Sequence, residues 1–382
     1  MMHDVVIVGG GFSGTIAAIV LARAGWQVAL VDRHLVYPPD FRAEHLHGEQ
    51  AETLRRLGVL DEVVAGVPPV RQVADARRGR LCGVRPTLNY GMRYETMVNT
   101  ARALLPAEVE KLFGRVEDLR AGAERQTVLL ADGSVASGRL LVLATGLGYT
   151  LNGRLGIGRR VLHEGHSLSF GFDMAPLSGG RFPYPFLAYP GERAADGIDY
   201  LSAFEIGEIM RANLFTFRAY RDAWTQAMRR EPERTLAEAL PGLAKVLGPY
   251  RVTSPVQARA MDLYQSENYR IPGVVLIGDA FQTACPPAGA GLTRALIDVE
   301  RLCTVHVPDW LATPGMGVEK IAAFYDDPVK RASDARATHD AHYRRALSTE
   351  TSLGWTLHRW RLRVQGWLPD LGSRLRPQQQ PA

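Results

Sequence analysis

Residues 4–14 read DVVIVGGGFSG, an apolar run that ends in closely spaced glycines. A continuous apolar run of this kind predicts a strand that is buried on both faces of a parallel sheet. An apolar helical segment follows at residues 16–21 and stops at Gly25, and a second apolar run occupies residues 28–32. The order strand, helix, strand over so short a stretch predicts a βαβ unit and, with it, a doubly wound α/β fold.

The glycines of this turn match the pattern G-x-G-x-x-G at Gly9, Gly11 and Gly14. The first glycine permits the sharp bend, the second lets backbone N–H groups approach a pyrophosphate, and the third allows the helix to pack closely on the strand. Ser13 belongs to the same turn, and the helix start offers free N–H donors to phosphates. Asp32 ends the second strand, where a carboxylate accepts hydrogen bonds from a ribose and disfavours a 2′-phosphate. These features predict a dinucleotide site.

A second glycine-rich helix start lies far along the chain. Residues 274–280 read VVLIGDA, which predicts a buried strand followed by a turn. Residues 286–295 read PPAGAGLTRA and open a helix that reaches Leu302 or beyond. A dehydrogenase that binds only a nicotinamide dinucleotide has no need of a second such site, whereas an enzyme that binds a flavin dinucleotide does.

Together these motifs resemble those of the FAD-dependent group A aromatic hydroxylases, the p-hydroxybenzoate hydroxylase-like flavoprotein monooxygenases. Residues 41–44 and 54–59 also resemble the family's arginine segment and the helix after it, and the resemblance extends over about residues 1–305. The positions that match the second motif are Gly278, Asp279, Ala280, Pro286, Gly289, Gly291, Leu292 and Asp298.

The resemblance implies roles for residues at the adenosine and pyrophosphate end of FAD. Asp32 would hold the adenosine ribose, Arg33 would lie beside the adenosine half, and Val116 would lie against the adenine. Arg42 and Arg93 would lie near the pyrophosphate, together with the three glycines of the first turn.

The resemblance also implies roles at the flavin end. Asp279 would hold the ribityl chain, and the turn from Gly289 to Thr293 would point backbone N–H groups at the N1/O2 edge of the ring. Such donors stabilise the negative charge of reduced flavin. Pro286, Pro287 and Gly289 would lie beside the flavin ring. The residues expected to bind FAD are Gly9, Gly11, Ser13, Gly14, Asp32, Arg33, Arg42, Arg93, Val116, Asp279, Pro286, Gly289, Gly291, Leu292 and Thr293.

Three positions depart from the family's pattern. Gln282 stands where the family usually has His, and Thr293 stands where it usually has Asn. Residues 144–146 read ATG, where the family has an Asp-Gly pair that contacts both FAD and NAD(P)H. Many other flavoproteins with two dinucleotide sites carry Ala-Thr-Gly, so the route by which electrons reach the flavin stays open.

The function that the resemblance implies is monooxygenation. NAD(P)H would be the transient reductant, and reduced FAD would react with O2 to form a C4a-hydroperoxide that hydroxylates or epoxidises a small aromatic or polyketide-like molecule. Since the flavin carries the chemistry, no catalytic acid or base is assigned. An FAD-dependent dehydrogenase or reductase is the alternative. A flavin-dependent halogenase is disfavoured because W-x-W-x-I-P is absent, and a non-catalytic FAD-fold protein because both cofactor motifs are intact.

The motifs predict a discontinuous FAD-binding (Rossmann-like) domain, an interleaved mixed β-sheet substrate domain and a helical C-terminal extension. Residues 168–204, rich in aromatics and turns, predict antiparallel strands, whereas 206–248 predict helices and 71–95 show less regular patterning. Residues 112–116 predict one strand, 317–368 predict helices, and 374–382 predict a frayed end. The expected boundaries are 1–70, 96–160 and 266–305 for the FAD-binding domain, 71–95 and 161–265 for the substrate domain, and 306–382 for the extension.

Four residues are candidates for the substrate pocket. His45 and His47 follow the arginine segment that the family places near the flavin, and Tyr184 and Phe186 belong to the aromatic-rich segment. An apolar wall over a flavin would exclude water. A surface or structural role for the histidines and core packing for the aromatics are the alternatives.

The chain carries a formal net charge of +5, almost all of it from arginine dispersed among acidic residues. The densest clusters, at residues 77–80 and 359–363, predict a solvated surface rather than a nucleic-acid site. Three cysteines without a C-x-x-C motif, together with the lack of an export signal or a long apolar run, predict a cytoplasmic protein without stable membrane insertion. The pairs His163/His166 and His339/His342 lack further ligands, so no metal site is expected.

The C-terminal helix carries an apolar stripe that could dock on the chain's own surface, on a second copy or on a membrane surface. The expected partners are a small organic substrate and O2, with the chain as a monomer or homodimer. The stripe consists of Leu353, Leu357, Trp360, Val364 and Trp367.

Overall fold

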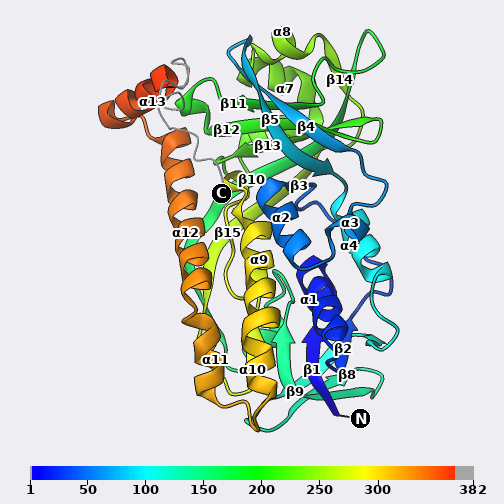
Figure 1. Ribbon diagram of the computed structural model, residues 1–382. Helices are drawn as coiled ribbons and strands as arrows, with labels where there is room; N and C mark the ends of the chain where they lie inside the picture. The colour runs from blue at the N-terminus through cyan, green and yellow to red at the C-terminus, as the bar shows by residue number, and fades with distance from the viewer. Residues whose placement is uncertain (1, 366–382) are drawn as a thin grey trace, which may run out of the picture.

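The computed structural model describes residues 2–365, which form two β-sheets flanked by helices (Figure 1). In Figure 1 the sheet that contains the N-terminal strand lies in the lower half of the molecule, and the sheet that contains the β4–β5 hairpin lies in the upper half. Within the described residues, no helix is both long and apolar enough to cross a membrane.

The first sheet confirms the doubly wound fold. Strand β1 pairs in parallel with β2 on one side and with β9 on the other. Val5, Val6 and Ile7 are completely buried, as the central position of β1 in a largely parallel sheet requires. The strand order is β6–β2–β1–β9–β8–β7, with β16 also paired to β9. The strands are β1 (Met2–Val8), β2 (Val28–Asp32), β6 (Glu110–Phe113), β7 (Val116–Arg120), β8 (Gln126–Leu130), β9 (Val135–Leu143) and β16 (Val274–Leu276).

Helices from distant parts of the sequence pack on this sheet. Helix α1 (Phe12–Arg23) contacts both α4 (Tyr94–Ala103) and α9 (Ala290–Arg301). Helix α9 continues through a π-helical turn at Leu302–His306 into α10 (Val307–Leu311). The second glycine-rich motif thereby lies beside the first, although nearly the whole sequence separates them.

The second sheet is mixed. Its strand order is β14–β10–β13–β12–β11–β4–β5–β3, with β15 paired to β10. All its pairs are antiparallel except β11 with β4. The strands are β3 (His45–His47), β4 (Pro69–Arg77), β5 (Arg80–Gly91), β10 (Gly158–Pro176), β11 (Phe186–Pro190), β12 (Ile198–Ile206), β13 (Ile209–Thr216), β14 (Tyr250–Val252) and β15 (Gln257–Glu267).

The two faces of the second sheet have different surroundings. One face packs against the short helices α6–α8 and forms the second hydrophobic core, with Leu187, Leu201 and Leu236 fully buried. The opposite face carries Phe186 and Phe204 and turns toward the rest of the molecule. The short helices of the fold are α2 (Gly48–Arg56), α3 (Leu60–Val63), α5 (Thr150–Arg154), α6 (Ala223–Arg230), α7 (Pro232–Ala239) and α8 (Leu243–Leu247).

Two local predictions were wrong, and one segment had no predicted element. Residues 71–95 contain the long hairpin of β4 and β5, whose turn places Arg78 at φ 49° and Gly79 at φ 76°. The hairpin escaped the pattern analysis because arginines interrupt its apolar positions. The strand expected at 112–116 is two strands, which separate at Gly114, and the first eight residues after Glu208 form β13 rather than a helix. Strand β13 is buried between β10 and β12, so sheet pairing decides its conformation.

The C-terminal region is helical, as predicted, up to Gln365. Helices α11 (Val318–Tyr325) and α12 (Pro328–Thr349) follow α10, and α12 runs beside α9 (Figure 1). Helix α13 (Leu353–Gln365) contacts α12 but leaves Leu353 75% and Trp360 61% exposed. Trp367 and the end expected to fray at residues 374–382 lie outside the described residues.

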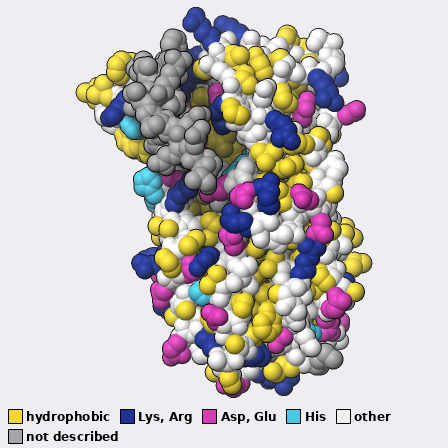
Figure 2. Space-filling view, viewed as in Figure 1, with side chains coloured by type: hydrophobic (Ala, Val, Ile, Leu, Met, Phe, Trp, Pro, Cys, Tyr) yellow, Lys and Arg dark blue, Asp and Glu magenta, His cyan; other side chains and the backbone are white. Residues whose placement is uncertain are grey.

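The surface charge is dispersed. Figure 2 shows arginine and lysine side chains interspersed with acidic ones over the visible face, without one continuous basic area. The three cysteines are free thiols, with Cys285 and Cys303 buried.

Candidate cofactor and substrate site

The first glycine turn is closed by tight backbone packing. Gly9 has φ 111°, and a Cβ at this position would overlap the carbonyl of Ala144. A Cβ at Gly14 would overlap the carbonyl of Gly9, so helix and strand approach each other as closely as the motif predicts. At Gly11 a Cβ would meet only the Tyr94 hydroxyl, at 3.7 Å. Helix α1 has no side-chain cap at its start, so its N–H groups face this space.

The carboxylate of Asp32 is held at the end of β2. It accepts hydrogen bonds from the backbone N–H of Gly10 at 2.7 Å and of His34 at 2.8 Å. Arg102 Nη2 lies 3.1 Å from Asp32 Oδ1, and Arg102 Nε donates to the carbonyl of Gly10 at 2.8 Å. Arg33 is exposed beside this arrangement. Arg102 was missed because it lies on α4, with no motif around it.

Arg42 connects the first motif to the second. Its Nη1 lies 3.3 Å from Asp279 Oδ2, and its Nε donates to Asp40 Oδ2 at 2.6 Å. The Arg42 guanidinium also lies 5.8 Å from the ring centre of Tyr94, whose hydroxyl accepts a hydrogen bond from the N–H of Phe12. Burial opposes the charge of Arg42, but Tyr94, Asp279 and Asp40 outweigh burial and raise its pKa. The cation is therefore permanent at this junction.

Arg93 belongs to a different network. Its Nη2 donates to both carboxylate oxygens of Asp173, at 2.7 and 2.8 Å, and its Nη1 donates to Glu44 Oε1 at 3.3 Å. The buried Arg211 completes the network by donating to Glu44 at 2.7 Å. These carboxylates occupy the Arg93 guanidinium, so its predicted place near a pyrophosphate stays a prediction. Val116, at the start of β7, is half-buried against the first core.

The second glycine-rich segment forms the start of α9. A 3-10 turn at Pro286–Ala288 leads into Gly289, which has φ 66° and precedes the first residue of the helix. No side chain caps this helix. Thr293 Oγ1 accepts a hydrogen bond from Gln50 Nε2 at 3.2 Å and lies 3.5 Å from His47 Nε2. Gly291 and Leu292 lie in the first turn of α9, and Leu292 packs against the first core.

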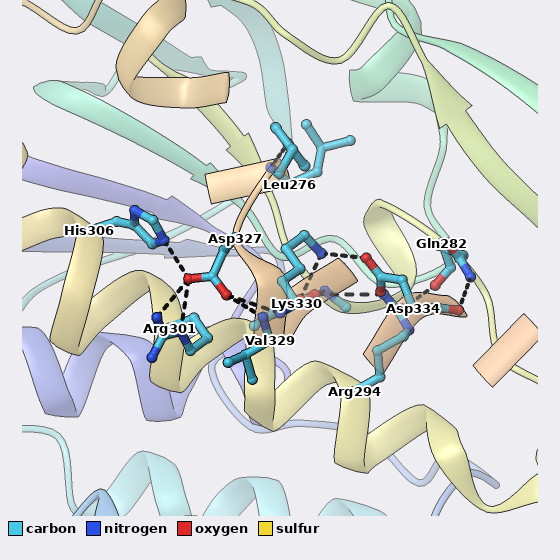
Figure 3. Close-up of polar contacts among 12 residues, drawn as sticks. Leu276, Gln282, Arg294, Arg301, His306, Asp327, Val329, Lys330 and Asp334 are labelled. Atoms are coloured by element: carbon cyan, nitrogen blue, oxygen red, sulfur yellow. Dashed lines mark hydrogen bonds and ion pairs between the residues drawn. The ribbon is translucent and has the colours of Figure 1, made fainter. Parts of the chain in front are cut away.

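A buried network holds α9 and the Gly278 turn against α12 (Figure 3). Asp298 on α9 accepts a hydrogen bond from the N–H of Gly278 at 2.9 Å and forms a 2.8 Å ion pair with Lys330 on α12. Asp334 bridges Lys330, at 3.1 Å, and Arg294, at 3.0 Å. Gln282 donates to Thr338 of the same helix. Lys330 and Asp334 lay beyond the motif segments and were not anticipated.

These features fit the two halves of a flavin dinucleotide. Two helix starts without side-chain caps, at α1 and α9, offer N–H groups and positive dipole ends to a phosphate and to an anionic ring edge. Between them, Arg42 and Asp279 lie at the junction of the two motifs. A residue larger than glycine at position 11 would narrow the space between Gly11 and the Tyr94 hydroxyl.

A cavity of about 930 Å³ adjoins the start of α9. Pro287, Ala288 and His47 line it at this end, and the exposed faces of β4, β5, β11 and β12 form its long wall. His45 and Phe186 also line it, in line with the sequence prediction, whereas Tyr184 packs against the second core. Further lining residues include Val73, Asn89, Tyr200, Ser202, Tyr343 and Leu362.

The imidazole of His45 is neutral in this cavity. Its ring lies 4.9 Å from the ring centre of Phe204 and 5.7 Å from that of Phe186. Burial, with a smaller effect of His47, lowers the pKa of His45 to about 4. Burial also lowers the pKa of His47, although Glu49 and the carbonyl of Gly289 oppose it. Both histidines are therefore neutral donors and acceptors near neutral pH.

Within residues 2–365, no group of three or more His, Cys, Asp or Glu side chains is arranged to hold a metal ion. His163 and His166 instead stack edge to face, 5.0 Å between ring centres.

Comparison with known proteins places the site in context. The family described as FAD binding domain matches residues 2–305. Aklavinone 12-hydroxylase DnrF of Streptomyces peucetius is 25% identical over 333 residues, which is 77% of this chain and 65% of that protein. The chain thus spans just under two thirds of the curated relatives it matches.

Solved structures of flavoenzymes share the fold. p-Nitrophenol 4-monooxygenase PnpA of Pseudomonas putida has a TM-score of 0.71 at 18% identity, covering 96% of this chain and 93% of its own. OxyS anhydrotetracycline hydroxylase of Streptomyces rimosus has a TM-score of 0.67 at 21% identity, covering 96% and 74%. A flavin-dependent brominase has a TM-score of 0.69 at 16% identity, covering 96% and 94%.

Proposed function

Because this chain belongs to the FAD binding domain family, we propose that it is an FAD-dependent monooxygenase of the group A type, acting on a small aromatic or polyketide-like molecule. The observation that carries this proposal is the shared wall of the cofactor and substrate spaces. Pro287 and Ala288 line the cavity and immediately precede the uncapped start of α9. A molecule in the cavity would therefore lie against the same loop as the reacting edge of the flavin.

FAD, when bound, supplies the redox chemistry that activates O2 for transfer of one oxygen atom. The N–H groups at the start of α9 stabilise negative charge at the edge of the site. Arg42 and Asp279 hold the centre of the cofactor, and Pro287 restricts the loop between cofactor and substrate. Phe186 and Phe204 exclude water from the substrate side. The neutral His45 hydrogen-bonds to the substrate without adding charge.

The size of the cavity supports a substrate with several rings. Its volume of about 930 Å³ lies toward the upper end of ordinary small-molecule sites, which measure roughly 300–1,000 Å³. The curated relative acts on aklavinone, and one structural neighbour on anhydrotetracycline. We therefore place polycyclic aromatic compounds first among candidate substrates.

A dehydrogenase of the same superfamily is the second candidate. Residues 144–146 read Ala-Thr-Gly, and the Ala144 carbonyl packs directly against Gly9. This segment provides no carboxylate for a nicotinamide, so the reductant is NAD(P)H bound in another manner or a separate reductase.

The test begins with purified protein loaded with FAD. The flavin is reduced under anaerobic conditions with NADH, NADPH or dithionite and then mixed with isotopically labelled O2 and a panel of polycyclic phenols. The expected product contains one oxygen atom from O2. A protein that takes up no FAD, or one whose products never contain oxygen from O2, would overturn the proposal. Reduction of oxidised FAD by the substrate under anaerobic conditions would establish the dehydrogenase, and incorporation of added bromide would establish a halogenase.

A further inference from the structure

Arg77 lines the cavity without an acidic partner. The other two arginines of the lining are neutralised: Arg85 Nε lies 2.7 Å from Asp75, and Arg344 Nη2 lies 2.7 Å from Asp199. Among the side chains that the structure describes, no carboxylate lies within 4.0 Å of the Arg77 guanidinium. The remaining lining carboxylate, Asp340, lies on α12 near Arg336.

The charge of Arg77 is partly withdrawn from solvent. Burial lowers the pKa of Arg77; the Cys82 thiol opposes this effect, and the neighbouring Arg78 adds to it. No acidic residue takes part in this balance. Since a guanidinium stays protonated in proteins, the cavity contains a fixed positive charge that no described residue compensates.

The position of Arg77 defines the far end of the cavity. Along β4, Val73, Asp75, Ala76 and Arg77 line the cavity. The pairing of β4 with β5 is irregular between Asp75 and Ala76. His47 lies at the flavin end of the cavity and pairs with Asn89, near the end of β5. Arg77 pairs with Arg80, at the beginning of β5. The lining of β5 extends from Cys82 to Asn89, which spans roughly 23 Å at about 3.3 Å per residue. Arg77 and the flavin loop therefore lie at opposite ends of a long cavity.

Two buried polar atoms lie along this cavity without a partner among the described residues. Ser202 Oγ is buried on β12, and its side chain is only 2% exposed. His45 Nδ1 is buried near the flavin end. Such groups cost free energy unless a ligand or water satisfies them.

We infer that the substrate is an elongated aromatic acid whose anionic group binds Arg77 while the ring to be modified lies at the Pro287 end. This inference rests on the proposed function, because it assigns the ends of the cavity relative to the flavin. The aromatic wall of the cavity then accepts the planar body of the substrate, and the charge of Arg77 sets the orientation of the substrate. A neutral molecule of the same shape lacks the contact that sets this orientation.

The inference is tested by binding rather than turnover. The FAD-loaded protein is titrated with planar carboxylic acids of one to four fused rings, each paired with its uncharged carboxamide, and binding is followed by the flavin absorbance. The three- and four-ring acids are expected to bind at least about tenfold more tightly than their amides. This preference is expected to weaken as salt concentration rises. One-ring acids, too short to reach both ends, are expected to show little preference.

Variants of Arg77 test whether this residue causes the preference for acids over their carboxamides. Arg77→Gln is expected to reduce it to less than about twofold, and Arg77→Lys to retain part of it. Arg80→Gln removes the same charge from the same hairpin at an exposed position outside the cavity lining, and is expected to retain it fully. FAD content and thermal stability are measured on each variant.

The inference is overturned if no acid binds more tightly than its amide, or if Arg77→Gln retains the preference. The proposed function fails separately. The acids could bind in an Arg77-dependent manner while no oxygen from O2 enters any product. That result would support the anion site and overturn the proposed monooxygenase activity. If neutral polycyclic compounds are hydroxylated as efficiently as the matched acids, and Arg77→Gln changes neither rate, the chain is a monooxygenase but the acidic substrate class is wrong.

Discussion

Lys330 Nζ lies 2.8 Å from Asp298 Oδ1, and both side chains are almost completely buried, at 0% and 1% exposure. The other oxygen of Asp298 accepts the N–H of Gly278. One ion pair thus connects α12 to the turn that presents Asp279 to the cofactor site. The C-terminal helix, which contains no cofactor motif, holds the flavin end of the site in place.

Removal of Lys330 should strongly destabilise the protein. Lys330→Met leaves Asp298 buried beside the Gly278 turn with only the more distant Arg294, whose Nη1 lies 3.7 Å from Asp298 Oδ2, as its cation. Removal of one partner of a buried pair costs about 3–5 kcal/mol in comparable proteins. Urea unfolding of the FAD-loaded protein measures this loss. Arg331→Met, at the adjacent exposed position, should change the free energy of unfolding by no more than about 0.5 kcal/mol. Equal stability of the two variants would show that the ion pair is not essential to this junction.

Two glycines of the first turn should respond differently to alanine. Gly11→Ala places a methyl group in the open space below Tyr94, with a backbone that tolerates it, so the FAD-free protein should lose no more than about 1 kcal/mol. FAD affinity should nevertheless fall at least about tenfold, because the methyl group occupies the approach to the pyrophosphate. Fluorescence titration with FAD measures this. In Gly14→Ala the methyl group overlaps the Gly9 carbonyl, so the fold itself should be destabilised. Unchanged FAD affinity in Gly11→Ala would show that the pyrophosphate does not bind next to Gly11.

His45 should make stability depend on pH. Its pKa is lowered to about 4 in the folded protein, against about 6.5 in the unfolded chain. Between these values the unfolded chain binds the additional proton, so stability is complete above about pH 6.5 and falls as the pH decreases toward 4. From pH 7 to 5 the loss attributable to His45 is on the order of 2 kcal/mol. His45→Phe should lose correspondingly less stability over this interval. Parallel pH profiles of the two proteins would contradict a neutral, buried His45.

Ser202 should matter for binding rather than for stability. Its buried hydroxyl has no partner among the described residues, so Ser202→Ala should leave the free energy of unfolding unchanged or raise it by about 1 kcal/mol. If the hydroxyl contacts the substrate, KM should rise several-fold while kcat changes little. Steady-state kinetics with an accepted substrate separate the two parameters. A large loss of stability would instead indicate that the hydroxyl has a structural partner.

The sequence predicted the cofactor half of the molecule well. The strand, glycine turn and helix of residues 2–23 are a local unit, in which the residue types needed for a close backbone approach are adjacent in the chain. The same holds for the turn at Pro286–Gly289 and the helix after it. Of the residues proposed for the substrate pocket, His45 and Phe186 line the cavity, whereas Tyr184 packs against the second core, and their roles toward a substrate stay predictions.

The second sheet was predicted less accurately. The β4–β5 hairpin was missed because arginines interrupt its apolar positions. Strand β13 was missed because its conformation depends on pairing with β10 on one side and β12 on the other. The arginine cluster at residues 77–80 was interpreted as solvated surface. In the fold Arg77 turns onto the cavity face, and Arg80 remains exposed.

By itself, the sequence determined the family, the doubly wound fold and the two helix starts suited to FAD, because these depend on residue types at short spacing. Only the tertiary structure decided that Lys330 compensates Asp298 and that Arg77 has no such partner among residues 2–365. Compensation of a charge depends on which distant residues lie within a few ångströms of it, and folding alone establishes those distances.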